Sequence, residues 1–123
     1  MDYLIIAGDR RYNDYDEFKE KVNHLIYKHS FVDPDIFTII SGCATGADAM
    51  AINYAEEYNI PLMKFPAKWE IHGKIAGFVR NEEMAKNASH LIAFVSPQSR
   101  GTRDMIKRAV KHKLKTKVIE IAV

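Results

Sequence analysis

The sequence predicts an α/β domain with a Rossmann-like three-layer architecture, in which a mostly parallel five-stranded sheet has helices on both faces. Short apolar runs alternate with amphipathic stretches along the chain, in the order βαβαβαβαβ. Most of these apolar runs are continuous, which is typical of strands that helices cover on both sides. Because helical crossovers join them, the strands are expected to lie parallel to one another with right-handed connections.

Five segments are expected to form the strands, because each is a short run rich in apolar and β-branched residues. They are Tyr3–Ala7, Ile36–Ile40, Leu62–Phe65, Leu91–Val95 and Val118–Val123.

Four helices are expected between these strands. The first opens with Asp14 and, three residues later, Glu17, a spacing that resembles a capping box. The second opens at Thr45. The third spans Ile75–Ala88, and the fourth follows the fourth strand. The third is expected to turn Ile75, Phe78 and Val79 inward, and the fourth to bury Met105, Ile106, Ala109, Val110 and Leu114 along one face.

Length and composition restrict the classes of protein that the chain can belong to. A chain of 123 residues has the size of one domain, and no repeat, low-complexity segment or linker divides residues 1–123. Hydrophobic residues make up 47% of the chain and charged residues 28%, which excludes intrinsic disorder. The longest apolar runs fall far below the roughly 20 residues of a transmembrane helix, so we expect no membrane partner.

The cellular location and the absence of cofactors are also predicted. The N-terminus lacks the basic start and long apolar stretch of a secretory signal. Its single cysteine, Cys43, has no partner for an internal disulfide, and a packing role is expected for it. These features predict a cytoplasmic protein. The five histidines show no metal-ligand spacing, so we expect no metal site and no cofactor.

Open parallel sheets bind ligands beyond the carboxyl ends of their strands, where the strand order reverses. Three loops rich in small or polar residues fall there, at 8–13, 41–46 and 96–102. Each could bring backbone N–H groups to the start of a helix, which favours an anion. The alternative for each loop is a structural turn, with Thr45 as the cap of the second helix. The candidate ligand-binding residues of these three regions are Gly8, Asp9, Arg10, Ser41, Gly42, Gly46, Asp48, Ser99, Gly101 and Thr102.

The segment between the third and fourth strands adds further candidates. It contains the only tryptophan, Trp69, which could stack on a base or cover the core. Arg80, Asn81 and Glu83 bring a cation, an amide and a carboxylate together around one helical turn. This combination suits a sugar phosphate, and it also suits a surface ion-pair network. Together with the three loops, these residues point to a nucleotide-like ligand.

Charge is distributed unevenly along the chain. The net charge is only +2, which disfavours a nucleic-acid partner, but residues 99–123 are strongly basic. This basic end could face an anion or form a solvated helix face.

Four segments together resemble the YspA-type branch of the SLOG superfamily over nearly the whole chain. They are "AGDRRYND", "SGCATGADAMAINYAEE", "FPAKWEIHGKIAGFVRNEEM" and "SRGTRDMIKRA". The resemblance implies a single Rossmann-like nucleotide-binding domain that forms homodimers or higher homo-oligomers. SLOG relatives include Lonely Guy phosphoribohydrolases, DNA-processing protein A, and sensor domains that bind nucleotides related to NAD and ADP-ribose.

Residue by residue, the resemblance assigns further roles. Arg80, Asn81 and Met84 correspond to the R-K-x-x-M segment of the Lonely Guy enzymes, which implies that Arg80 contacts phosphoribose or takes part in catalysis. Pro97, Gly101 and Thr102 match a second segment of the Lonely Guy enzymes, P-G-G-x-G-T-x-x-E. Gln98 and Ser99 replace its two glycines, and Met105 replaces its glutamate. The S-G-x-A-x-G-x-D loop of DNA-processing protein A is matched by Ser41, Gly42, Ala44, Gly46 and Asp48.

The expected function is therefore the binding of a nucleotide or nucleotide-derived small molecule at the carboxyl edge of the sheet. A nucleoside monophosphate N-glycosidase is the first alternative, and it would use Arg80 together with Glu83 as its carboxylate. Binding of single-stranded nucleic acid through the basic C-terminal region is the second alternative.

Overall fold

Five parallel strands form one sheet in the order β3-β2-β1-β4-β5. The computed structural model describes all 123 residues. The strands are β1 (Asp2–Gly8), β2 (Phe37–Ser41), β3 (Leu62–Lys64), β4 (His90–Val95) and β5 (Lys115–Glu120). The chain moves outward from β1 to β3 and then returns to the other side of β1, so the strand order reverses between β1 and β4.

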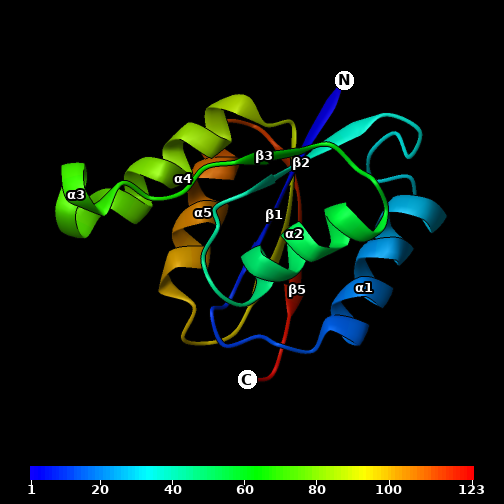
Figure 1. Cartoon of the computed structure of the whole chain (residues 1–123), viewed down its shortest axis with the longest axis horizontal. Coiled ribbons are helices and arrows are strands. Elements are labelled where there is room, and N and C mark those ends of the chain that lie inside the picture. Colours follow the sequence, from blue (N-terminus) through cyan, green and yellow to red (C-terminus); the bar gives the residue numbers. More distant parts are fainter.

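Helices cover both faces of this sheet, which confirms the predicted α/β architecture (Figure 1). One core cluster joins alternate strand residues such as Leu4 and Ile6 to α1 and α2. The other joins Ile5 and Ala7 to α4 and α5 on the opposite face. The helical elements are α1 (Tyr15–Asn23), α2 (Ala47–Glu57), α3 (Trp69–His72), α4 (Ala76–Asn87) and α5 (Arg100–Lys111), with a π-helix η1 (His24–Lys28) and a 3-10 helix η2 (Gly73–Ile75).

Helix α1 begins where the sequence predicts. The Asp14 side chain accepts a hydrogen bond of 3.0 Å from the Glu17 backbone N–H and so caps the helix. The chain then widens into the π-helix η1, within which Ile26 stays fully buried. No helix in the structure combines the length and the apolar composition needed to span a bilayer.

Helix α4 differs from the prediction in the face that it buries. Ile75 and Phe78 are exposed, and the sheet is instead contacted by Met84 and Ala85. The reason is that α3, η2 and the start of α4 extend beyond the edge of the sheet (Figure 1), so large side chains there meet no core. The prediction that Ile75, Phe78 and Val79 face inward is therefore wrong, since Val79 is only half-buried.

The C-terminal third differs in two further places. Val110, expected in the buried stripe of α5, is 64% exposed, whereas Met105 and Ala109 are buried as expected. Strand β5 begins at Lys115, three residues before the expected start at Val118. In this edge strand the exposed Lys115 and Lys117 flank a half-buried Thr116, so no continuous apolar run marks its start.

Candidate functional site

A cavity of about 300 Å³ opens at the carboxyl ends of β1, β2 and β3. Two arginines, one tryptophan and the small residues of the loop after β2 form its wall. The lining residues are Arg10, Gly42, Cys43, Ala44, Thr45, Pro66, Ala67, Trp69 and Arg80. They come from four segments, the loops after β1, β2 and β3 and helix α4, which the fold brings to one edge of the sheet.

Arg80 connects α4 to this loop. Its Nη1 donates a hydrogen bond to the carbonyl oxygen of Gly42, and its Nε donates to Oδ1 of Asn81 at 3.0 Å. Nη2 has no acceptor within the protein. Burial lowers the pKa of Arg80, and the carboxylate of Asp48 acts in the opposite direction. An arginine stays protonated at neutral pH, so the wall carries a half-buried cation whose Nη2 nitrogen has no protein acceptor.

Asp48 lies beneath the same loop and is only 5% exposed. Its Oδ2 accepts a hydrogen bond of 3.2 Å from the Ala44 backbone N–H, and its backbone carbonyl accepts 2.9 Å from the Ser41 hydroxyl. Burial raises the pKa of the Asp48 carboxyl, whereas the Ala44 N–H and the charge of Arg80 lower it. Asp48 therefore fixes the conformation of the loop after β2 through its hydrogen bonds with Ser41 and Ala44.

Two glycines allow this close packing. A Cβ on Gly42 would lie 2.7 Å from Nη1 of Arg80 and 2.9 Å from Oδ2 of Asp48. Gly46 has φ of +77°, and a Cβ there would overlap the backbone carbonyl oxygen of Asp9. Only glycine fits at either position without displacing its neighbours.

The start of α2 differs from its expected form. The helix begins at Ala47 with Gly46 as N-cap and no side-chain cap, so Thr45 does not cap it. Thr45 instead lines the cavity, and its backbone N–H donates to no protein acceptor. That N–H is available to an anion beside the positive end of the helix dipole.

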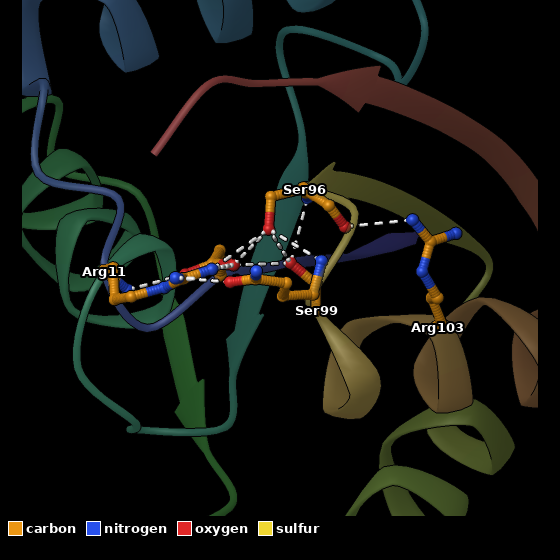
Figure 2. A network of polar contacts seen from close by, with 6 residues as sticks. Arg11, Ser96, Ser99 and Arg103 are labelled. Carbon is orange, nitrogen blue, oxygen red and sulfur yellow. Dashed lines mark hydrogen bonds and ion pairs between the residues drawn. The ribbon is translucent and has the colours of Figure 1, made fainter.

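A separate buried network occupies the point where the strand order reverses. Oδ2 of Asp9 accepts hydrogen bonds of 2.6 Å from both Ser96 and Ser99, and the Arg11 guanidinium pairs with the same carboxylate at 3.0 Å. Figure 2 shows Arg11, Ser96 and Ser99 converging, with Arg103 reaching the Ser96 carbonyl from α5. These contacts, with Arg11 the largest influence, hold the pKa of Asp9 well below its usual range. Asp9 thus ties two loops together and offers no free oxygen to a ligand.

Comparison with known proteins identifies the family. Residues 3–72 match the model of the YspA, cpYpsA-related SLOG family. The chain belongs to this family. Its SLOG membership indicates a function in nucleotide-related ligand binding or nucleic-acid processing. The matched range contains Arg10 and the loop after β2 but ends before Arg80.

Two relatives of this SLOG chain are informative. The Gene 61 protein of Mycobacterium phage D29 is 31% identical over 117 residues, which cover 90% of each protein. DNA processing protein A from Streptococcus pneumoniae superimposes on the whole chain with a TM-score of 0.76 at 14% sequence identity. That match covers 52% of the pneumococcal chain, so the SLOG chain spans about half of its length. At this identity the likeness shows the shared fold.

The structure brings four of the residues expected at the SLOG site into the cavity wall: Arg10, Gly42, Trp69 and Arg80. Five others support this wall or the adjoining loops, namely Gly8, Ser41, Gly46, Asp48 and Asn81. Asp9 and Ser99 belong to the buried network at the reversal of strand order.

The remaining three expected residues neither line the cavity nor support its wall. The Glu83 side chain is exposed on α4, and Thr102 is buried in α5. Gly101 is separated from Arg80 by Asn81, whose Nδ2 donates to the Gly101 carbonyl at 3.3 Å. The anion donors of the third loop therefore lie apart from the arginines.

Sequence reasoning missed several lining residues. The sequence predicts structural roles for Cys43 and Thr45, and Pro66 and Ala67 are not among its candidate residues, yet all four line the cavity. The signal for Pro66 and Ala67 was their position directly after the third strand, at the same edge as the other loops.

Proposed function

We propose that this protein binds a nucleotide or nucleotide-derived small molecule, with a phosphate held in the cavity between Arg10 and Arg80. The observation that carries this proposal is the free Nη2 of Arg80, a half-buried guanidinium whose other nitrogens are fixed by Gly42 and Asn81. A charged donor fixed in this way is suited to an anion that offers paired oxygens.

The electrostatics of the cavity support an anionic ligand. Arg10 is exposed and forms no ion pair with a carboxylate, and its charge lowers the pKa of Arg80. Two guanidinium groups that repel each other would be stabilised by a phosphate between them. The free N–H of Thr45 adds an uncharged donor at the start of α2.

Binding is favoured over hydrolysis of an N-glycosidic bond. Such hydrolysis needs a carboxylate close to the sugar, either to stabilise positive charge or to activate water. Glu83 does not line the cavity, and Met105 lies 1% exposed in the core. Asp48 is the nearest buried carboxylate, and it already accepts a hydrogen bond from the loop.

Nucleic-acid binding through the C-terminal region is also less favoured. Arg108 forms ion pairs with Glu82 and Asp104, and Lys111 forms an ion pair with Glu82. These pairs within the protein reduce the positive charge that this region offers to a phosphate backbone.

Calorimetric titration tests the proposal directly. AMP and ADP-ribose should bind the parent protein, and adenosine, which lacks the phosphate, should bind far more weakly. Arg80→Ala and Arg10→Ala should each reduce AMP affinity. Arg100→Ala is the matched control, because Arg100 is exposed on α5 and does not line the cavity. Equal affinity for AMP and adenosine, or equal effects of all three substitutions, would contradict the proposal.

A further inference from the structure

Trp69 is the only tryptophan of the chain, and 52% of its surface is exposed. It stands at the start of the short helix α3, which lies beyond the edge of the sheet at the outer end of α4 (Figure 1). A tryptophan that covered the core would be buried, so the exposed ring has no structural task of that kind. Trp69 nevertheless lines the cavity that also has Arg10 and Arg80 in its wall.

The ring lies close to the free donor of Arg80. A Cβ placed on Gly77 would be 3.7 Å from Cη2 of Trp69 and 3.7 Å from Nη2 of Arg80. The aromatic edge and the guanidinium therefore flank the same point on the first turn of α4. A ligand with its phosphate on Arg80 would have its next portion beside the indole.

We infer that Trp69 is the stacking platform for the base of a single nucleotide whose phosphate lies on Arg80. This inference deepens the proposed function and depends on it. An indole is a flat aromatic surface on which a planar base can stack, half of this residue is exposed, and stacking needs no hydrogen-bond code. Pro66 and Ala67 form the adjoining apolar wall.

The size of the cavity sets the size of the ligand. A volume of about 300 Å³ lies at the lower end of the range for small-molecule sites, about 300–1,000 Å³. One nucleotide unit suits this space, and any second nucleotide unit of a larger ligand would extend into solvent. The ligand class is therefore a nucleoside monophosphate or one such unit at the end of a larger molecule, with purines favoured by their larger stacking surface.

Tryptophan fluorescence provides a local test, because the full chain contains one tryptophan. AMP should quench this fluorescence in a saturable manner. Ribose 5-phosphate should displace AMP without quenching by itself. In calorimetry, Trp69→Ala should weaken AMP binding about tenfold or more and leave ribose 5-phosphate affinity within about twofold, whereas Trp69→Phe should retain most AMP affinity.

Ile71→Ala is the matched control, because Ile71 lies in the same short helix, is 70% exposed and does not line the cavity. It should leave AMP binding unchanged. If ribose 5-phosphate binds as tightly as AMP and no quenching occurs, the base platform is overturned while phosphate binding stands. If neither molecule binds, both proposals fail.

The competing outcome is that Trp69 contacts another protein molecule, because other exposed apolar residues lie in the same region. Ile71, Ile75 and Phe78 are exposed beside Trp69. If Trp69→Ala and Ile71→Ala both change the mass measured by light scattering and neither changes AMP affinity, the tryptophan is a protein contact. That result would overturn the inference.

Discussion

Arg80 on α4 donates a hydrogen bond to the backbone carbonyl of Gly42, which follows β2, across 38 positions of the sequence. This contact orients the guanidinium toward the cavity instead of toward solvent. It also requires residue 42 to lack a side chain, because a Cβ there would lie 2.7 Å from Nη1.

The first prediction concerns this glycine. Gly42→Ala should displace the Arg80 guanidinium and reduce AMP affinity at least tenfold, measured by calorimetry. Gly101→Ala is the control, since a Cβ on Gly101 meets nothing within 4 Å. Comparable losses in both variants would show that the contact between residues 42 and 80 does not position the ligand.

The second prediction concerns the shape of the cation. Arg80→Lys keeps the positive charge but cannot bond Gly42, Asn81 and a phosphate at once. AMP affinity should fall by about 1–3 kcal/mol, the scale of a hydrogen bond to a charged group. An unchanged dissociation constant would assign Arg80 a purely structural role.

The third prediction concerns Asp9. Asp9→Asn should lower the free energy of unfolding by about 1–3 kcal/mol, because the hydroxyls of Ser96 and Ser99 lose a charged acceptor. The pKa of Asp9 in the folded protein is depressed from its usual value of 3.8. This contribution is therefore complete above that value and declines as the pH falls below it. Chemical denaturation between pH 7 and pH 3 should show the variant converging on the parent at low pH.

The fourth prediction concerns Glu82. Hydrogen bonds from His112 and Arg108 lower the pKa of Glu82 from 4.5 to about 2. Because this pKa is depressed in the folded protein, the ionised Glu82 carboxylate stabilises the fold above pH 4.5. This contribution is lost as the pH falls from 4.5 toward 2. Glu82→Gln should therefore flatten the decline of stability across that interval. Glu83→Gln, at an adjacent exposed residue that forms no ion pair, should follow the parent profile.

The fifth prediction is that the protein releases no base from AMP, GMP, CMP or UMP. The carboxylate that such chemistry needs is absent from the cavity wall, because Glu83 lies outside it and Met105 is core. Chromatography of the reaction mixture would detect free base. Turnover by the parent that disappears in Glu83→Ala would establish the enzyme in place of the binding protein.

The sequence predicted the fold well because apolar patterning reports burial directly. Continuous apolar runs located the central strands, β1, β2 and β4, where helices cover both faces. The pattern failed where burial is absent. Strand β5 at the edge carries lysines in place of apolar residues, and Ile75 and Phe78 are apolar but project past the sheet. Hydrophobicity alone does not distinguish a core residue from one exposed on a projecting segment.

The candidate site could be predicted only as a set of loops. Strand topology placed Arg10, Gly42 and the start of α2 at one edge, and the structure confirms that these segments adjoin. The hydrogen-bond partners at that edge of the sheet were not predictable from the sequence. The Asp9 side chain accepts a hydrogen bond from Ser99, 90 positions away, and Asn81 donates one to Asp104, 23 positions away. Which polar groups neutralise each other, and which stay free, depends on side-chain geometry that no sequence spacing encodes.

The buried carboxylate network between the first and last of these loops has a consequence for amide hydrogen exchange. Loops at a binding edge usually exchange their amide protons rapidly. Here the amides of Asp9, Arg11 and Ser96 donate to the Phe94 carbonyl, the Asp9 carboxylate and the Ser99 hydroxyl. Their deuterium uptake should be slow and should require opening of the sheet itself. The backbone amide of Thr45, which has no protein acceptor, should exchange within the dead time of the measurement until a ligand covers it.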